Sequence, residues 1–300
     1  MSPKHVVSIS LGSSARNHRV IVELLGQQVT VERIGTDGDL QRVIEHIQQL
    51  DGAVDAFGMG GIDRYIYVQD KRYTFREAET IARHARKTPI LDGSGLKNSL
   101  ERHVVQVLAD DPRVLLRGKK VLLVSAVDRF GMAAALVELG CEVTFGDLMF
   151  GLGVPVPIRS LRSLDRLARV IAPIVTKLPF RYLYPTGEKQ RDITAKYEDH
   201  YLAADVIAGD FHYIRRHLPE RLPGKIILTN TVTQEDVELL RARGVRMLVT
   251  TTPNLDGRSF GTNVMEALIV ALAEGKGELL PDEYLKILHA IGFSPRIEEF

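Results

Sequence analysis

The chain has 300 residues, of which 45% are hydrophobic and 26% are charged, and its formal net charge is +1 at pH 7. These values are typical of a globular protein, and so small a net charge provides no overall field that would attract nucleic acid or an anionic membrane. No apolar run reaches the roughly 18 residues needed to span a bilayer. The first residues lack the apolar core of a signal peptide. We therefore expect a cytoplasmic protein with no nucleic-acid or membrane partner.

Cysteine and histidine usage bears on redox state and metal binding. The chain has one cysteine, Cys141, which excludes an internal disulfide, and its place at the start of an apolar strand favours a buried thiol. The histidines are scattered, and no pair of them has metal-ligand spacing with carboxylates nearby. We therefore expect no metal site.

The first third of the chain predicts a small α/β domain with a mixed sheet. Three segments rich in β-branched residues predict strands, with a hairpin at Gly26 between the second and the third. A helix capped by Asp39 follows, then a strand, a second hairpin and two helices that flank a short strand. The basic, proline-containing linker 110–120 ends this domain, to which we assign residues 1–112. The segments are 5–11, 19–25, 28–34, 40–50, 53–59, 64–75, 76–87, 88–93 and 96–109.

The rest of the chain, residues 113–300, predicts a doubly wound, Rossmann-like α/β domain. Continuous apolar runs alternate with helical segments, as expected for parallel strands that helices cover on both faces. The predicted strands are 120–125, 142–146, 204–208, 225–230 and 246–251. In such sheets ligands bind beyond the carboxyl ends of the strands. The candidate loops are therefore 125–131, 146–151, 208–212, 229–233 and 250–254.

Residues 119–147 have the order of a dinucleotide site: strand, turn, helix, strand and an acidic residue. The turn "SAVDRFG" keeps only Gly131 of the three expected glycines, whereas Asp147 stands where a ribose-binding carboxylate is found and favours NAD over NADP. Arg129 could pair with a phosphate. In the alternative reading, Asp128 only caps the helix and Asp147 lies in a solvated loop. The predicted cofactor contacts are Ser125, Val127, Asp128, Arg129, Phe130, Gly131 and Asp147.

With the segments "SLGSS", "IGTDGD", "VDRFGMA" and "EVTFGDLMFGLG", the chain resembles the quinate/shikimate dehydrogenase group, in particular bacterial chains labelled quinate 5-dehydrogenase. The resemblance spans nearly the whole chain. It implies a substrate domain joined to a C-terminal nicotinamide-binding domain, and a polyhydroxy carboxylic acid as the substrate. The segment "PILDGSGLKNSLERH" is similar in shape to the one that carries the catalytic lysine of that group, which implies this role for Lys97. The acid of "GTDGD", Asp37, precedes Lys97 rather than following it and is not given the family aspartate's role.

Two segments provide candidate acid–base residues. Asp92, Ser94 and Lys97 follow a short buried strand and converge on one loop, where partial burial would lower the lysine pKa towards catalytic use. The segment "AGDFHYIRRHLP" places Asp210 and His212 where a strand turns into a helix, so that both can face a cleft. The structural alternative is that Asp210 caps the helix and His212 is half-buried.

Further substrate contacts are predicted at three loops. The N-terminal turn offers Ser13, Ser14 and Arg16 to a carboxylate or phosphate, or is merely a tight turn with a basic edge. This segment also looks like the first phosphate segment of sugar-kinase and actin-type ATPases, although Ser10 stands where those proteins have a metal-organising aspartate. Asp63, after "GMGGI", is either a hydroxyl acceptor or half of a surface ion pair.

The loop "TTTPNLDGRSFGTN" follows the last apolar strand. We expect Thr250 and Thr251 beside a nicotinamide ring, and Asn254 and Arg258 at the substrate, unless the loop is only a capped connection. The polar segment 183–197 predicts a flap over the cleft, with Lys189 as its contact.

We therefore expect an NAD(P)-dependent oxidoreductase that transfers a hydride between a nicotinamide cofactor and a polyhydroxy carboxylic acid such as quinate or shikimate. Lys97 or His212 would exchange the hydroxyl proton. The alternatives are a non-catalytic small-molecule sensor that uses the same interdomain cleft, and a phosphate-binding transferase built on the N-terminal Gly-Ser-Ser turn. The apolar segment "VMEALIVALA" near the C-terminus is compatible with a homodimer.

Overall fold

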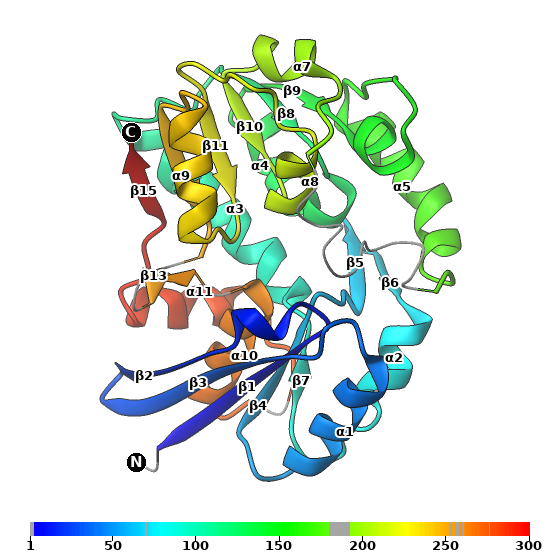
Figure 1. The fold of residues 1–300 in the computed structure, drawn as a ribbon, viewed down its shortest axis with the longest axis vertical. Helices are drawn as coiled ribbons and strands as arrows, with labels where there is room; N and C mark the ends of the chain where they lie inside the picture. Colours follow the sequence, from blue (N-terminus) through cyan, green and yellow to red (C-terminus); the bar gives the residue numbers. More distant parts are fainter. Residues whose placement is uncertain are drawn as a thin grey trace.

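The computed structural model in Figure 1 describes two lobes, each built around a β-sheet. The described residues are 3–69, 71–179, 193–252, 254–255, 258–259, 261–275 and 277–300, with backbone only at 254–255 and 258–259. Lys189 and most of the predicted flap lie outside this part of the chain.

The first sheet has the strand order β2-β3-β1-β4-β7. Strand β2 runs antiparallel to β3, whereas the other neighbours are parallel, so the predicted mixed sheet is confirmed. Gly26 adopts a positive φ of 71° in the β2–β3 turn, as a tight hairpin requires. The bounds are β1 Lys4–Ser10, β2 His18–Leu24, β3 Gln27–Gly35, β4 Ala56–Gly60 and β7 Ile90–Leu91.

The second sheet has the order β15-β12-β11-β10-β8-β9 and is parallel except for the edge strand β15. The doubly wound α/β arrangement is therefore confirmed. Its central strands are buried, as their continuous apolar runs predicted. The sequence pattern did not reveal β15, because "RIEE" has no apolar run. The bounds are β8 Lys120–Leu123, β9 Glu142–Phe145, β10 Val206–Ala208, β11 Ile226–Thr229, β12 Met247–Thr250 and β15 Arg296–Glu299.

Helices cover both sheets, and a small hairpin lies between the lobes. The predicted cap of α1 is confirmed, because the Asp39 carboxylate accepts the N–H groups of Gln41 and Arg42. The helices are α1 Leu40–Leu50, α2 Arg76–Ala82, α3 Ser94–Asp110, α4 Phe130–Glu138, α5 Leu161–Val175, α7 Glu198–Ala203, α8 Phe211–Arg216, α9 Gln234–Ala242, α10 Thr262–Leu272 and α11 Pro281–Ala290. The short strands are β5 Tyr65–Val68, β6 Lys71–Thr74, β13 Asn254–Leu255 and β14 Arg258–Ser259.

The predicted domain division near residue 112 needs a correction. Helix α10 packs on β1 and β4 of the first sheet, and α11 packs on α3, before β15 returns to the second sheet (Figure 1). The close approach of α10 requires glycine at Gly58, because a Cβ there would lie 2.9 Å from the Asn263 amide nitrogen. The first lobe therefore contains residues from both ends of the chain. The apolar side of α10 is buried within the chain and is not a surface for a homodimer.

The strand order reverses at β8, which lies between β9 and β10. A doubly wound sheet opens a crevice beyond the carboxyl ends of its strands at such a switch point. Among the described residues, no helix is both long and apolar enough to cross a membrane. Cys141 is buried, as predicted.

Candidate functional site

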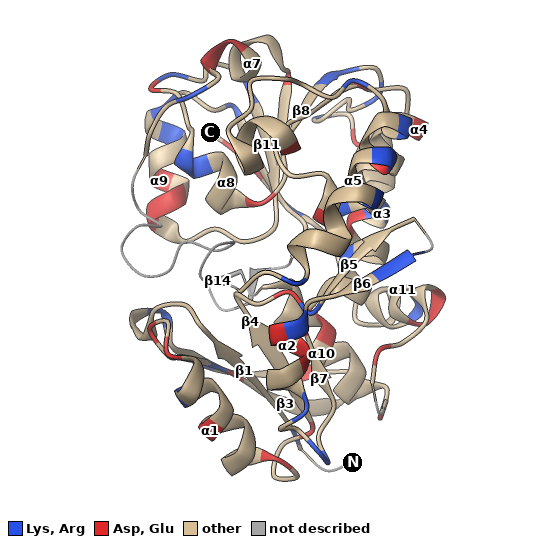
Figure 2. Ribbon diagram, turned by 90° about the vertical axis from the view of Figure 1, so that its right-hand side faces the viewer, with Lys and Arg blue, Asp and Glu red and all other residues tan. Residues whose placement is uncertain are grey.

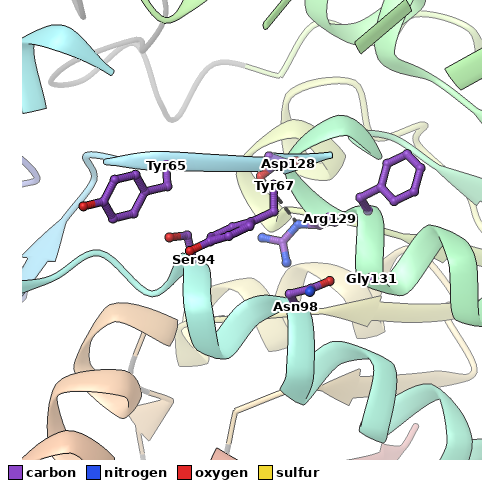
Figure 3. A pocket seen from close by; sticks show the side chains of 8 residues that line it. Tyr65, Tyr67, Ser94, Asn98, Asp128, Arg129 and Gly131 are labelled. Atoms are coloured by element: carbon purple, nitrogen blue, oxygen red, sulfur yellow. Dashed lines mark ion pairs between the residues drawn. The ribbon is translucent and has the colours of Figure 1, made fainter. Parts of the chain in front are cut away.

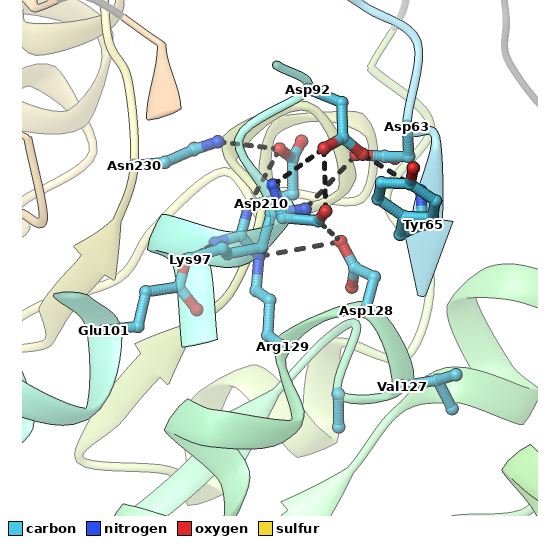
Figure 4. A network of polar contacts seen from close by, with 12 residues as sticks. Asp63, Tyr65, Asp92, Lys97, Glu101, Val127, Asp128, Arg129, Asp210 and Asn230 are labelled. Atoms are coloured by element: carbon cyan, nitrogen blue, oxygen red, sulfur yellow. Dashed lines mark hydrogen bonds and ion pairs between the residues drawn. The ribbon is translucent and has the colours of Figure 1, made fainter. Parts of the chain in front are cut away.

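Polar side chains that follow strands of both sheets meet between the lobes (Figure 4). Helix α3 adds two residues one turn apart, Lys97 and Glu101. The strand ends contribute Asp63 after β4, Asp92 after β7, Asp128 and Arg129 after β8, Asp210 after β10, and Asn230 after β11. We call these eight residues the interdomain cluster. Ligand sites in such sheets are expected beyond the carboxyl ends of the strands, and the charged side chains of this protein lie at that place.

Lys97 bridges the two lobes. Its ammonium nitrogen lies 3.3 Å from Asp63 Oδ1 in the first lobe and 3.5 Å from Asp128 Oδ2 in the second. Burial alone would lower the lysine pKa, but these two carboxylates outweigh it and raise the pKa above its ordinary value. The predicted lowering of the Lys97 pKa is therefore wrong, and the side chain remains a cation at neutral pH. Asp63 is a partner of this cation rather than half of a surface pair.

Arg129 forms the second ion pair of the cluster and faces inwards. Its guanidinium contacts Glu101 Oε1, and its Nη2 lies 3.3 Å from Asp210 Oδ2. Both Arg129 and Glu101 are buried almost completely, and burial raises the pKa of Glu101 to about 7 although Arg129 opposes this. The predicted role of Arg129 as a phosphate partner is not supported, because its guanidinium is taken up by these carboxylates.

Asp210 is both a helix cap and an ion-pair partner. Its Oδ1 accepts the backbone N–H of His212 at 2.9 Å, and its Oδ2 accepts from the Asn230 amide at 3.0 Å. Burial would raise the Asp210 pKa, but the charges of His212 and Arg129 and these hydrogen bonds hold it at about 2. Asp210 is therefore held in its ionised form, and its contacts correspond to the structural alternative, a helix cap, together with an ion pair to Arg129. The side chain of His212 is exposed.

Asp92 organises the loop between β7 and α3. Its Oδ2 accepts the backbone N–H groups of Arg64 and Tyr65 at 2.6 and 3.0 Å, and its Oδ1 accepts from the Ser94 hydroxyl at 2.7 Å. Burial and the nearby charge of Asp63 raise the Asp92 pKa. Ser94, a predicted substrate contact, is thus bound to Asp92 at the edge of the cluster.

The turn after β8 is closed by the acid that was predicted to bind ribose. Asp147 Oδ1 accepts the backbone N–H groups of Ala126 and Val127 at 2.9 and 2.8 Å. Burial raises the Asp147 pKa to about 7, although these two hydrogen bonds lower it. Within the described part of the chain, Asp147 Oδ2 and the Ser125 hydroxyl are buried without a hydrogen-bond partner. Asp147 is therefore half-buried, with Oδ1 bound to the turn and Oδ2 buried, so that its carboxylate oxygens do not face a ligand.

Gly131 and Phe130 pack helix α4 onto α3. A Cβ at Gly131 would lie 2.5 Å from Asn98 Oδ1 and 2.6 Å from the Asn98 carbonyl oxygen, so this glycine permits helix contact rather than approach of a phosphate. The neighbouring cavity in Figure 3 has a volume of about 10 Å³, room for about one water molecule. It is lined by Tyr65, Tyr67, Ser94, Asn98, Asp128, Arg129, Phe130 and Gly131.

These contacts test whether a nicotinamide dinucleotide fits the turn. A diphosphate bound there would need backbone N–H donors, but Asp147 accepts two of them and would repel the anion. The Arg129 guanidinium is paired with Glu101 and Asp210 and is therefore not available to a phosphate in this turn. The turn as folded does not fit a dinucleotide in the manner of a glycine-rich phosphate loop, and the predicted roles of Asp147 and Val127 are corrected accordingly.

Thr250 and Thr251, at the end of β12, are fully buried. The Thr250 hydroxyl donates to the Thr252 carbonyl at 2.8 Å, and the Thr252 hydroxyl donates to the Asn230 carbonyl at 2.7 Å. Thr251 donates its backbone N–H to the Thr229 carbonyl at 2.7 Å, and its hydroxyl is buried with no hydrogen-bond partner among the described residues. The contacts of Thr250 and Thr252 support the capped-connection alternative. Asn254 and Arg258 belong to β13 and β14, but their side chains lie outside the described part of the structure.

The N-terminal turn satisfies its own polar groups. The Ser13 hydroxyl accepts the Ala15 N–H at 3.2 Å, and the Ser14 N–H donates to Asp37 at 2.7 Å. Arg33 donates to the Ser13 carbonyl at 3.0 Å. Arg16 ends this short 3-10 turn. These contacts describe a closed turn and correspond to the structural alternative for Ser13 and Ser14.

Sequence reasoning missed Glu101 and Asn230. Glu101 had a signal, because it stands four residues after Lys97 on a predicted helix and so shares its face. Asn230 lies in a loop that the strand pattern nominated. Within the described ranges, no group of three or more His, Cys, Asp or Glu side chains is arranged to hold a metal ion.

Solved structures with low similarity include dehydrogenases and sugar-binding proteins. L-tryptophan dehydrogenase from Nostoc punctiforme is 12% identical over 96% of this chain and 79% of that chain, with a TM-score of 0.40. The malic enzyme of Entamoeba histolytica is 10% identical over 96% of this chain and 61% of that chain, with a TM-score of 0.42. A galactofuranose binding protein is 12% identical over 97% of this chain and 99% of that chain, with a TM-score of 0.35. Scores this low do not transfer an activity to the chain.

No curated protein matches the sequence. Two protein-family models do. The model described as Domain of unknown function (DUF8753) matches residues 5–92, and the one described as Domain of unknown function (DUF8754) matches residues 95–300. The two matches meet between Asp92 and Lys97, inside the interdomain cluster. Because the second match covers more than half of its length, the chain belongs to the family described as Domain of unknown function (DUF8754).

Proposed function

We propose that the interdomain cluster binds a small molecule that carries several hydroxyl groups. The observation that supports this most strongly is the position of Lys97 between Asp63 and Asp128, which come from different lobes. The side chains of these two acids are 24% and 29% exposed, so a ligand can reach their oxygens while Lys97 stays buried. Carboxylates accept from ligand hydroxyl groups, and an ammonium group donates to them.

The charge balance of the cluster favours such a ligand over a simple anion. The two part-exposed carboxylates of Asp63 and Asp128 outnumber the one cation between them, Lys97. An excess of acceptors suits a ligand that donates several hydrogen bonds. A single carboxylate on the same ligand can still pair with Lys97, which is compatible with a polyhydroxy acid. This function corresponds to a small-molecule sensor or binding protein.

The second candidate is an oxidoreductase acting on the same ligand class, with quinate or shikimate as the substrate that the resemblance implies. It is favoured by the same three residues, because a hydroxyl group placed beside Lys97 could pass its proton to Asp63 or Asp128. Bound NAD or NADP would supply the hydride acceptor. The residues of turn 125–131 do not fit that cofactor as folded, so its binding would require Asp147 to release the turn.

Calorimetric titration with quinate and shikimate tests binding, together with mass spectrometry of small molecules retained by gently purified protein. Lys97→Met should weaken affinity by about 10- to 100-fold, because a charged hydrogen bond is lost. Lys286→Met removes an exposed lysine elsewhere and should change nothing. Equal loss in both variants, or retained ligand unaffected by Lys97→Met, would refute the proposal. Substrate-dependent formation of NADH distinguishes the oxidoreductase from the sensor.

A further inference from the structure

A larger groove lies on the first lobe and borders the interdomain cluster. It has a volume of about 650 Å³ and runs past the β5–β6 hairpin, the end of α2 and the loop that leads to β7. This size is typical of sites for small metabolites. Asp92, a member of the interdomain cluster, also lines the groove. Tyr65 lines the groove as well and lies beside the cluster (Figure 4).

Basic side chains dominate the walls of this groove. Figure 2 shows Lys and Arg on β6 and at α2, and the loop 86–87 adds two more cations. Two carboxylates pair with this set: Glu79 is shared by Arg64 and Arg83, at 2.8 and 3.4 Å, and Glu278 pairs with Arg72 at 3.2 Å. The lining cations are Arg64, Arg72, Arg83, Arg86 and Lys87. Asp92 and Glu266 also line the groove, so that four carboxyl groups face its five cations. Burial raises the pKa of Glu266 to about 8, which leaves this carboxyl group mostly uncharged at pH 7 and the groove with a small excess of positive charge.

Two of these cations lie against the same aromatic ring. The guanidinium carbons of Arg64 and Arg72 lie 4.9 and 4.4 Å from the centre of the Tyr65 ring. Each of these two guanidinium groups is also paired with a carboxylate, Arg64 with Glu79 and Arg72 with Glu278, so they form a fixed basic wall of the groove. Guanidinium groups recognise phosphate oxygens with paired hydrogen bonds.

The loop that carries Arg86 and Lys87 is fixed before any ligand arrives. The Asp51 carboxylate accepts the backbone N–H groups of Arg86, Lys87 and Thr88 at 2.9 Å, which holds the loop in one conformation. Both cationic side chains are exposed, and neither has an ion-pair partner among the described residues. A preorganised loop loses little conformational entropy on binding.

We propose that this groove is a binding site for the phosphate group of a small phosphorylated molecule, with Arg86 and Lys87 as its principal contacts. A small molecule is favoured over nucleic acid because the groove is concave and of metabolite size, about 650 Å³, and because Arg86 and Lys87 lie together at one point rather than along an extended basic stripe. The site is separate from the hydroxyl-binding function of the cluster and does not depend on it.

Calorimetry at low ionic strength tests the site with AMP, its phosphate-free match adenosine, and inorganic phosphate. The wild type should bind AMP and not adenosine. Arg86→Ala/Lys87→Ala should weaken AMP binding by about 10- to 100-fold, because two charge-assisted contacts are lost. The matched control Arg19→Ala/Lys286→Ala removes the same charge from exposed positions elsewhere and should change affinity by less than about twofold.

Several outcomes discriminate. Phosphate binding as tightly as AMP, with the same loss in the double variant, supports the site with free phosphate as its ligand. Equal binding of adenosine, equal loss in the control, or tighter binding of a single-stranded oligonucleotide than of AMP would overturn the proposal. Arg86→Gln provides a second variant if thermal melting shows that the double variant is unfolded. Lys97→Met should leave AMP binding unchanged, so failure here is distinguishable from failure of the hydroxyl-binding site.

Discussion

Lys97 and Arg129 are two buried cations of the same cluster, but their surroundings differ. Arg129 is 1% exposed, and its closest partner, Glu101, has no exposed side-chain surface at all. Lys97 is 9% exposed, but its partners Asp63 and Asp128 are 24% and 29% exposed. The Arg129–Glu101 pair is sealed inside the protein, although Asp210, the second partner of Arg129, is 22% exposed. Lys97 has no such sealed partner, because both of its carboxylates are part-exposed.

This difference separates a structural ion pair from a candidate binding group. A fully desolvated pair that loses one member leaves an uncompensated buried charge. A pair whose carboxylates reach solvent can exchange its partner for water or for a ligand group. The exposure of the partner, rather than the burial of the cation, therefore identifies the residue that is available for function.

The largest expected effect comes from removing Arg129. Arg129→Met should lower the free energy of unfolding by about 3–5 kcal/mol, because Glu101 would remain buried without its cation. Urea or thermal unfolding measures this. The double variant Arg129→Met/Glu101→Leu should recover much of the loss. A loss below about 1 kcal/mol in the single variant would mean that the pair is not sealed.

Lys97→Met sharpens the contrast. It should lower the free energy of unfolding by only about 1–2 kcal/mol, because water can hydrate the part-exposed carboxylates of Asp63 and Asp128. The same unfolding experiment measures it beside Arg129→Met. If the two variants proved equally destabilised, exposure of the partner would not distinguish the two cations.

Asp147 provides a pH test of the turn after β8. Burial raises its folded-state pKa from 3.8 to about 7, so the folded protein binds this proton more tightly than the unfolded chain. Its contribution to stability is complete below pH 4 and is lost as pH rises towards 7. Asp147→Asn keeps an oxygen that can accept the N–H groups of Ala126 and Val127.

The variant should therefore show a shallower fall in stability between pH 4 and 7, by about 3 kcal/mol over that interval, because each pH unit between the two pKa values contributes about 1.4 kcal/mol. Chemical unfolding at several pH values measures the slope. Glu101 and Glu266, whose pKa values are also raised, should still contribute a fall in both proteins. An unchanged slope in Asp147→Asn would show that this carboxyl group is not titrating in the folded protein.

Periodicity and turn residues were sufficient to predict both sheets and their neighbouring helices. These patterns did not predict β15, which is a strand because it pairs with β12 and not because of its own apolar residues. They also did not predict that the chain returns to the first lobe at α10. The predicted strand ends indicated the loops in which most of the cluster lies, but they did not indicate which charged side chains would form ion pairs with each other. Arg129 and Asp147 follow strands as a cofactor site requires, but each is bound internally by groups distant in sequence, 28 residues away for Glu101 and about 20 for Val127.

His212→Gln has the smallest expected effect. It is a control for the comparison of Arg129 with Lys97, because His212 belongs to neither ion pair. The His212 ring is exposed, and it is the backbone N–H that donates to Asp210, so glutamine preserves the cap of α8. The charge of His212 helps to keep the Asp210 pKa at about 2, but Arg129 and Asn230 remain to hold it low. Stability should therefore change by no more than about 0.5 kcal/mol. Ligand affinity should also match the wild type, in contrast to Lys97→Met.

If the protein oxidises quinate or shikimate and His212→Gln lowers kcat by about 10²- to 10⁴-fold, His212 is the proton-transfer residue. Lys97 would then be an anchor, and its variant should act mainly on KM.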